Sequence, residues 1–334
     1  MKRVVSLDEI QASEISPDSI YQEYTKNLQA DIKKYFGAAQ DLVEIACPGC
    51  GKKENAPAFQ KIGLQYRKCS RCMSWYVSPR PGEDKLRDFY QNSSACKYWR
   101  KEILHFSESH WLHIHAPRIH WILDLVDEFL PTGSLVCDFQ SKYPIFLNKL
   151  SEEKSIKLVV SVESLLFEQR TDSPKIEMGS VKSTEYREKI GVILAFETLE
   201  RVADVDQLFR FASESSQKGG LFLITTATCS GFEYQVLGEG APNLNPINRM
   251  NLLSIEALTK KVEEAGFEIL ELSTPGRLDA QIVQKALREN PDLMVGGFWE
   301  YILKNRDEKT WLNLQDFLQL NRLSSHVRIA ARKK

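Results

Sequence analysis

The chain has 334 residues, of which 43% are hydrophobic and 27% are charged, and this balance favours a globular protein with an ordinary buried core. The 44 basic and 45 acidic residues nearly cancel, so the overall charge does not indicate a nucleic-acid or membrane partner. The sequence has no apolar run of about 18 residues, and its first residues lack the apolar stretch of a signal peptide. We therefore expect a cytoplasmic protein without a membrane span.

Residues 1–40 are predicted to form an N-terminal helical segment. Within it, apolar side chains recur every four residues, at Ile20, Tyr24, Leu28 and Ile32. This spacing places them on one face of a helix, which would pack against the rest of the protein.

Four of the seven cysteines form two Cys-x-x-Cys pairs with 18 residues between them: Cys47, Cys50, Cys69 and Cys72. A gap of two residues lets both thiolates of a pair face one zinc ion at about 2.3 Å. Four thiolates close the coordination shell, so the pattern favours a structural zinc site over a dithiol redox site. Glycines provide the tight turn in the first pair only. We predict a zinc-ribbon module over residues 41–82, with a hairpin strand within 59–66.

Residues 83–130 are predicted to form a helical connector, and from residue 131 short apolar runs alternate with amphipathic segments. This alternation is typical of a parallel sheet covered by helices. A mostly helical insertion is expected at 276–321. The predicted strands are Leu135–Phe139, Leu158–Val162, Val192–Phe196, Leu221–Thr225, Phe267–Leu272 and His326–Ala331.

Residues 131–275 with 322–334 resemble the class I S-adenosylmethionine-dependent methyltransferases. Val192-Ile-Leu-Ala-Phe-Glu-Thr-Leu-Glu200 is similar to the family's fourth-strand segment, and Lys218-Gly-Gly-Leu-Phe-Leu-Ile-Thr-Thr226 is similar to its glycine turn and fifth strand. Asn251-Leu-Leu-Ser-Ile-Glu-Ala-Leu, Ala265-Gly-Phe and Ser273-Thr-Pro-Gly-Arg-Leu-Asp279 are similar to a bacterial subgroup. Members of that subgroup often carry an N-terminal zinc module and are associated with sugar or surface-glycan modification. The resemblance implies an α/β, Rossmann-like sheet of seven strands with the last strand antiparallel.

The resemblance also implies where the cofactor S-adenosylmethionine binds. Asp138 and Gln140 follow the first strand, Glu163 ends the second, where an acid can accept the ribose hydroxyls, and Phe196 ends the fourth. The loop after the first strand departs from the family, because Gln140, Lys142 and Pro144 stand at glycine positions. Glycine lets this backbone turn sharply and approach the cofactor, so we expect these replacements to weaken binding.

The catalytic residues that the resemblance implies are Glu197, Glu200 and Arg249. Transfer to an oxygen or carbon acceptor needs a positioned base, a role for which histidine is suited. The family's histidines after Glu200 and before Asn251 are replaced by Arg201 and Arg249, and arginine stays protonated. The base is therefore left open between the two glutamates, Tyr234 and His326.

Three functions follow as hypotheses. The first is a methyltransferase acting on a nucleotide-linked sugar or a surface-glycan precursor. The second is an inactive relative that serves as a binding or scaffold subunit, since several family residues are replaced at once. The third, an RNA methyltransferase, is disfavoured by the near-neutral charge. As a protein partner, a second copy of the chain or an active homologue is left open.

Overall fold

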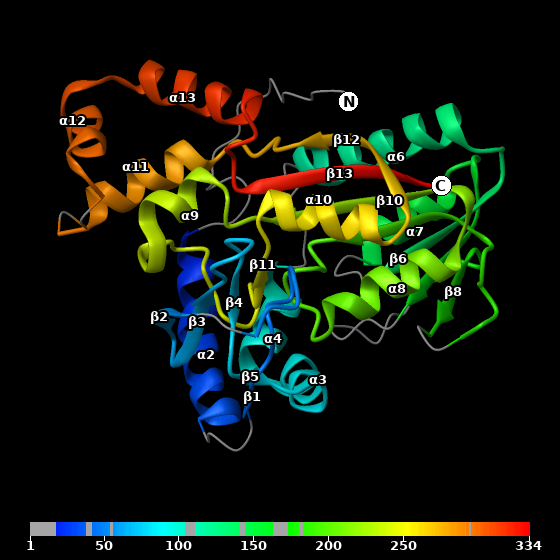
Figure 1. Cartoon of the computed structure of the whole chain (residues 1–334), viewed down its shortest axis with the longest axis horizontal. Helices are drawn as coiled ribbons and strands as arrows, with labels where there is room; N and C mark the ends of the chain where they lie inside the picture. Colours follow the sequence, from blue (N-terminus) through cyan, green and yellow to red (C-terminus); the bar gives the residue numbers. More distant parts are fainter. Residues whose placement is uncertain are drawn as a thin grey trace.

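The computed structural model describes residues 18–37, 42–53, 56–103, 111–140, 144–162, 173–180, 183–290, 292–293 and 295–334. Its centre is a seven-stranded sheet with the order β12-β13-β10-β9-β6-β7-β8 (Figure 1). Neighbouring strands are parallel except at β13, which is antiparallel to both β10 and β12. The strands are β6 (Ser134–Phe139), β7 (Ile156–Val162), β8 (Ile176–Gly179), β9 (Ile190–Phe196), β10 (Ser216–Ala227), β12 (Phe267–Ser273) and β13 (His326–Lys333).

The predicted α/β fold is confirmed, including the antiparallel last strand. Each of the six predicted strands lies within an observed strand, and the short edge strand β8 is the one that the sequence pattern did not predict. The central strand β9 is buried along its whole length, which explains its continuous apolar sequence.

Helices cover both faces of this sheet. On one face, Ile119 and Ile122 of α6 (Ala116–Phe129) and Leu147 of α7 (Pro144–Glu152) pack on Val136 and Leu194 of the strands. On the other face, α8 (Val205–Ser215) and α10 (Ile255–Glu264) pack on the second side of the strands. The carboxyl ends of the parallel strands, and the first residue of β13, therefore lie together at one edge.

A second hydrophobic core lies beside that carboxyl edge (Figure 1). It joins segments that are far apart in the sequence, and we call the described residues of 18–98, 228–252 and 279–320 the cap. Its helices are α2 (Asp18–Phe36), α3 (Glu83–Asn92), α4 (Ser94–Tyr98), α9 (Phe232–Leu237), α11 (Asp279–Glu289), α12 (Gly297–Asn305) and α13 (Glu308–Leu320). Short helical turns complete the described helices: η2 (Trp99–Ile103), η3 (Trp111–His115) and η4 (Gly238–Gly240).

Two small sheets complete the cap. Strands β1 (Leu42–Val43) and β5 (Arg80–Pro81) pair with each other. The other sheet has the order β11-β4-β3-β2, with strands β2 (Ala56–Lys61), β3 (Leu64–Lys68), β4 (Trp75–Val77) and β11 (Asn251–Leu252). Its strand β11 belongs to the stretch that links β10 to α10, so the cysteine-bearing hairpin and the central domain share one sheet.

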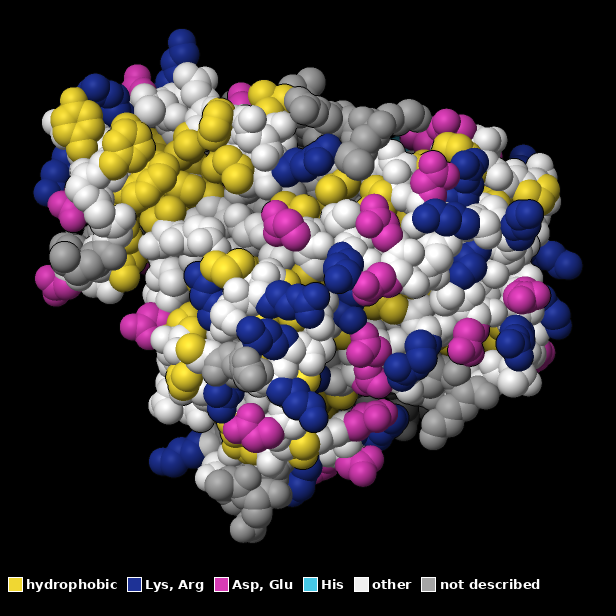
Figure 2. Space-filling view, viewed as in Figure 1, with side chains coloured by type: hydrophobic (Ala, Val, Ile, Leu, Met, Phe, Trp, Pro, Cys, Tyr) yellow, Lys and Arg dark blue, Asp and Glu magenta, His cyan; other side chains and the backbone are white. Residues whose placement is uncertain are grey.

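The helical patterns of the cap are also confirmed where the structure describes them. Tyr24, Leu28 and Ile32 are buried on one face of α2. The insertion after β12 forms α11, α12 and α13, and Figure 2 shows hydrophobic side chains gathered over the region of α12 and α13. No helix in the described part of the chain is long and apolar enough to cross a membrane.

Candidate functional site

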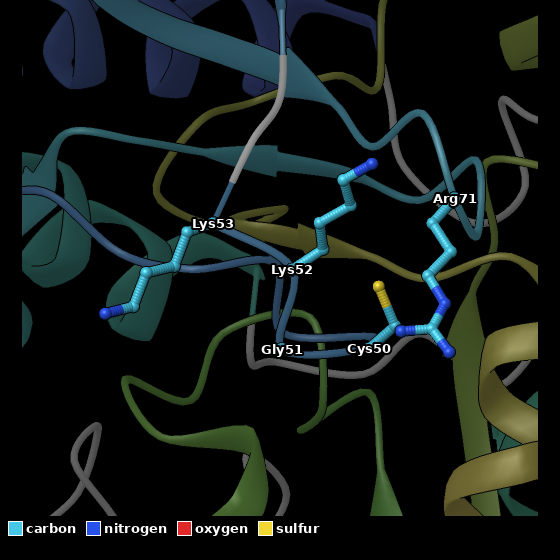
Figure 3. A pocket seen from close by; sticks show the side chains of 5 residues that line it. All are labelled: Cys50, Gly51, Lys52, Lys53 and Arg71. Carbon is cyan, nitrogen blue, oxygen red and sulfur yellow. The ribbon is translucent and has the colours of Figure 1, made fainter.

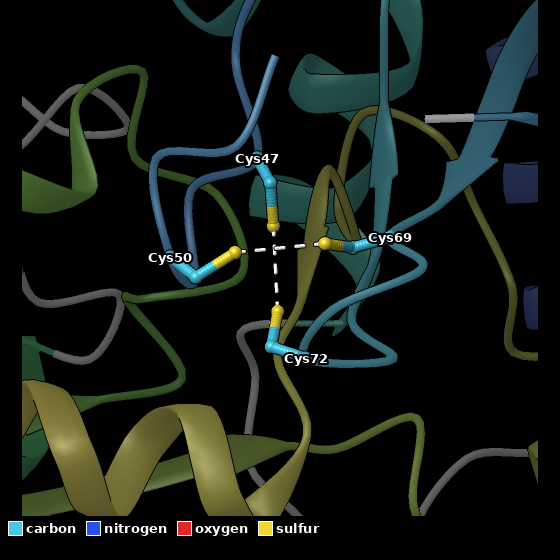
Figure 4. A group of neighbouring side chains, drawn as sticks. All are labelled: Cys47, Cys50, Cys69 and Cys72. Atoms are coloured by element: carbon cyan, nitrogen blue, oxygen red, sulfur yellow. Dashed lines mark hydrogen bonds between the residues drawn. The ribbon is translucent and has the colours of Figure 1, made fainter. Parts of the chain in front are cut away.

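The four predicted zinc ligands meet at one point beside the cap sheet (Figure 4). Their sulfur atoms all lie within 4.8 Å of one another, and the Cys47–Cys72 and Cys50–Cys69 sulfur pairs are 3.5 Å apart. A tetrahedral zinc ion with Zn–S bonds of about 2.3 Å needs sulfur atoms about 3.8 Å apart. The cysteines are free of disulfides, so the donor set and its spacing fit a structural zinc ion.

The two cysteine pairs lie in turns with the same backbone hydrogen bonds. In the first turn, Cys47 N–H donates to the Lys52 carbonyl at 2.9 Å and Gly51 N–H donates to the Cys47 carbonyl at 2.8 Å. In the second turn, Cys69 N–H donates to the Ser74 carbonyl at 2.9 Å and Met73 N–H donates to the Cys69 carbonyl at 3.0 Å. Gly51 has φ +71° and Met73 has φ +61°. The second pair therefore forms the same turn without glycine, with a methionine in the left-handed region.

The turn of the first pair packs against the start of α10. A Cβ atom added at Gly49 would lie 2.8 Å from Oγ of Ser74 and 3.1 Å from Cβ of Ala257, so there is no room for a side chain. Ser74 Oγ in turn accepts a hydrogen bond of 3.0 Å from the N–H of Ser254, the N-cap of α10. The cysteine cluster is thus joined directly to the central domain.

A shallow hollow of about 400 Å³ lies on the outer side of this cluster (Figure 3). Besides Cys50 and Gly51, it is lined by Lys52, Lys53 and Arg71. A zinc ion with four thiolates carries two negative charges, and nearby cations stabilise such a centre. Basic side chains along this hollow would therefore favour a metal centre of that charge.

Gln140 and Pro144 are the described residues of the predicted cofactor loop after β6. Gln140 has φ +55°, a conformation that glycine adopts easily, and its N–H donates to the Val162 carbonyl at 2.8 Å. Pro144 is the first residue of α7, where a missing N–H is tolerated. Asp138 in β6 is buried, with 1% of its surface exposed. Glu163 and Lys142 lie outside the described residues.

Phe196 ends β9 in a packed apolar position. Its ring stacks on Trp121 with 6.0 Å between centroids and lies 5.9 Å from the ring of Phe146. The guanidinium of Arg118 lies over the same ring at 5.4 Å. The side chain of Phe196 is therefore packed between α6, α7 and the sheet.

Glu197, the next residue, is held at the carboxyl edge by two partners. Arg118 of α6 donates to both carboxylate oxygens of Glu197, one at 3.0 Å, and the Thr225 hydroxyl donates to the carboxylate at 3.0 Å. Glu197 itself has φ +47°, and the Arg201 side chain donates to its carbonyl at 2.7 Å. This bidentate ion pair is the first charged group beyond the end of β9.

Glu200 and Arg249 form a second ion pair beside the first. Glu200 is completely buried, it pairs with the guanidinium of Arg249, and it accepts a hydrogen bond of 2.6 Å from the Thr226 hydroxyl. Burial lowers the pKa of Arg249, but the surrounding acidic groups, with Glu200 the largest contributor, together outweigh burial, so the pKa lies above its usual range. The structure thus brings Glu197, Glu200 and Arg249 together in two neighbouring ion pairs, and their catalytic role stays a prediction.

The backbone around Arg249 is held by the cap. Tyr90 of α3 donates to the carbonyl of Ile247 and Tyr66 of β3 donates to the carbonyl of Arg249, both at 3.0 Å. Three further contacts hold residues on either side of Arg249. Asn248 Nδ2 donates to the Tyr24 hydroxyl at 2.7 Å, and Val77 N–H donates to the Met250 carbonyl at 2.9 Å. The Arg80 guanidinium donates to Asn251 Oδ1 at 2.6 Å. The position of Arg249 therefore depends on the N-terminal part of the chain.

Two residues near these ion pairs were not assigned from the sequence pattern. Arg118 had no local signal, because its role arises only when α6 crosses the end of β9. Glu233 of α9 is buried, which raises its pKa to about 8, with a smaller contribution from the negative charge of Asp279. Asn243 donates to its carboxyl group at 3.2 Å. The contacts of Arg118 and Glu233 become evident only in the folded chain.

Comparison with known proteins finds one family match, in the central part of the chain. Residues 110–272 match the family described as "Methyltransferase domain". No curated protein matches the sequence. Among solved structures, the chain is similar to phosphoethanolamine N-methyltransferase 2 of Haemonchus contortus in complex with S-adenosyl-L-methionine, with 16% identity, TM-score 0.48, and 78% of this chain and 62% of that chain covered.

The chain is also similar to geranyl diphosphate C-methyltransferase from Streptomyces coelicolor, with 12% identity and TM-score 0.47. That similarity covers 75% of this chain and 97% of the other. Similarities at this level carry no information about the acceptor of this chain.

Proposed function

We propose that the protein, whose residues 110–272 match a methyltransferase domain, is an S-adenosylmethionine-dependent methyltransferase acting on a nucleotide-linked sugar or a surface-glycan precursor. The cofactor would lie beyond the end of β6, held by Asp138, Gln140, Glu163 and Phe196. When bound, the cofactor supplies a methyl group on a positively charged sulfur. The left-handed backbone at Gln140 and the helix start at Pro144 support this placement.

The proposed acceptor class rests on one observation, the hydrogen bonding and exposure of the Arg249 side chain. Its Nε donor is buried and has no hydrogen-bond partner among the described residues, although its side chain keeps 24% of its surface exposed. A buried donor without a partner costs about 1–3 kcal/mol, so such a group favours a bound acceptor atom. A guanidinium fits phosphate oxygens. Arg249 would therefore bind a phosphate of the sugar nucleotide.

The zinc ion has a structural part in this proposal. Bound by Cys47, Cys50, Cys69 and Cys72, it would fix the two turns that carry the cap sheet. That sheet includes β11 and holds the backbone of Arg249 through Tyr66 and Val77. The same proposal divides the chain into an N-terminal helical segment, a zinc module, a helical connector, a methyltransferase-like domain and a helical insertion. Their residues are, in that order, 1–40, 41–82, 83–130, 131–275 with 322–334, and 276–321.

The test uses the purified full-length chain with S-adenosylmethionine labelled in its methyl group. A panel of nucleoside diphosphate sugars is offered as acceptors, a nucleotide-free sugar series and an RNA mixture serve as comparisons, and labelled product is detected by mass spectrometry. We expect label on at least one nucleotide-linked sugar, and a Michaelis constant raised at least tenfold in Arg249→Gln, which is about 1.4 kcal/mol of lost binding.

Two results would reject the proposal. Label on RNA alone would favour an RNA methyltransferase. Binding of S-adenosylmethionine with no transfer to any acceptor would favour the inactive scaffold subunit. In both cases the cysteine cluster would keep its structural part, because its geometry does not depend on the acceptor.

A further inference from the structure

His326 is the first residue of β13 and lies where that strand enters the carboxyl edge of the sheet. Its partner in β10 is Ala227, two residues beyond Thr225, whose hydroxyl binds Glu197. Because β13 is antiparallel to β10, its beginning meets the ends of the parallel strands. The topology therefore adds one histidine to the edge where Glu197 and Glu200 lie.

The charged groups that act on His326 come from three different directions. Glu197 and Glu200 follow β9, Arg118 reaches in from α6, and Arg249 precedes β11. The two carboxylates and the two arginines already form ion pairs with each other, at Arg118–Glu197 and at Arg249–Glu200. The charges near the imidazole therefore occur as two ion pairs, in which each carboxylate is balanced by an arginine.

Burial lowers the pKa of His326 below its usual value of 6.5, and Arg118 and Arg249 act in the same direction, while Glu197 and Glu200 oppose them. The imidazole is therefore neutral at neutral pH. No hydrogen bond of its side chain occurs among the described contacts, and the residue keeps part of its surface accessible. A neutral imidazole can accept a proton.

The other candidates for the base are poorly suited to accept a proton. The Glu197 oxygens are bound by Arg118 and Thr225, and the Glu200 oxygens are bound by Arg249 and Thr226. Burial raises the pKa of Tyr234 far above neutral pH, so its phenol keeps its proton. Glu233 likewise holds its proton at neutral pH.

We propose that His326 is the general base of the methyl transfer, in place of the histidine that Arg249 replaces. The proposal rests on the proposed function. A hydroxyl oxygen of the acceptor bonds to the methyl carbon of the sulfonium donor while its O–H bond breaks, and the proton passes to His326. The electron pair of the broken carbon–sulfur bond stays on sulfur, giving a thioether. The imidazolium then releases its proton to water.

The test compares His326→Gln with the wild-type chain on the sugar nucleotide that the wild type methylates, at saturating S-adenosylmethionine. We expect kcat to fall about 10²–10⁴-fold, the usual contribution of a general base. The wild-type kcat should rise with pH through a midpoint below 6.5 and then level off, and this acidic limb should be absent in the variant. His120→Gln changes an exposed histidine of α6 and should leave both readouts unchanged.

A second measurement needs no acceptor. Histidine-labelled protein is titrated by NMR, and the His326 signal is assigned from its loss in His326→Gln. A midpoint below 6.5 is expected, whereas a midpoint above neutral pH would overturn the inference, because an imidazolium cannot accept the proton.

The outcomes separate the inference from the proposed function. A variant within threefold of the wild type, with its acidic limb intact, would overturn the role of His326 and leave the methyltransferase proposal standing. A wild-type chain that methylates none of the sugar nucleotides would reject the proposed function, and this inference with it.

Discussion

The hydroxyl of Tyr66, on the hairpin between the two cysteine pairs, donates a 3.0 Å hydrogen bond to the backbone carbonyl of Arg249. Tyr66 is completely buried, and its partner carries the guanidinium that pairs with Glu200. The bond connects the cysteine-bearing part of the chain to the charged edge of the central sheet. It makes the cap a support for the candidate site rather than a separate attachment.

Removing this one hydroxyl tests the connection. Tyr66→Phe keeps the ring but leaves the Arg249 carbonyl without its donor, which costs about 1–3 kcal/mol for a buried acceptor. We expect the free energy of unfolding in urea to fall by that amount. Tyr301→Phe, at a half-exposed tyrosine of α12, is the matched control and should change it by less than about 0.5 kcal/mol. Equal effects in the two variants would argue against the connection.

The Arg249–Glu200 pair should show the behaviour of a buried ion pair. Arg249→Met leaves the Glu200 carboxylate buried without its partner, which costs about 3–5 kcal/mol. Adding Glu200→Gln should restore most of that loss, because the uncompensated charge is then gone. Urea unfolding of the two single variants and the double variant measures the coupling. Additive losses would show that the two side chains do not depend on each other.

The cysteine cluster predicts one zinc ion per chain, measurable by elemental analysis of the purified protein. Cys69→Ser should abolish zinc binding and lower the melting temperature, because the metal's binding energy contributes to folding. Cys96→Ser alters a buried cysteine of α4 outside the cluster and should keep one zinc ion. If Cys69→Ser retained both its zinc content and its melting temperature, the metal assignment would be wrong.

Glu233 predicts a pH dependence of stability. Its pKa is about 8 in the folded chain and about 4.5 when unfolded, so the folded state holds the proton more tightly. This stability is fully present below pH 4.5 and is lost as the pH rises through 8. Glu233→Gln keeps an acceptor for Asn243 and removes the titration. Relative to wild type, its free energy of unfolding should therefore increase between pH 5 and pH 9, whereas Glu239→Gln, at an exposed position, should show no such trend.

Local patterns were sufficient to predict six strands of the central sheet and the cluster of four cysteines. The run at 192–196 reads as a buried strand because every residue is apolar, and the cysteine spacing encodes its own turn geometry. The N-cap at Ser254 is likewise a local feature, since its hydroxyl accepts from the Ala257 N–H at 3.1 Å. Each of these predictions depends on residues that are near one another in the chain.

The arrangement around Arg249 depends instead on contacts that no local pattern contains. Tyr24 and Asn248 are 224 positions apart, and Arg118 and Glu197 are 79 positions apart. The second cysteine turn was uncertain from the sequence because it lacks glycine, and the folded chain places Met73 in the left-handed region instead. The cofactor role of Glu163 lies outside the described residues and stays a prediction.

The most direct test of the account is a calorimetric titration of the full-length chain with S-adenosylmethionine, repeated with Pro144→Gly. We expect one site per chain with a dissociation constant on the order of micromolar to hundreds of micromolar in the wild type, the common range for enzyme substrates. Pro144→Gly should bind within a few-fold of the wild type, because Pro144 begins α7 where its missing N–H is tolerated. No heat from the wild type, with zinc content and circular dichroism intact, would contradict the proposed methyltransferase.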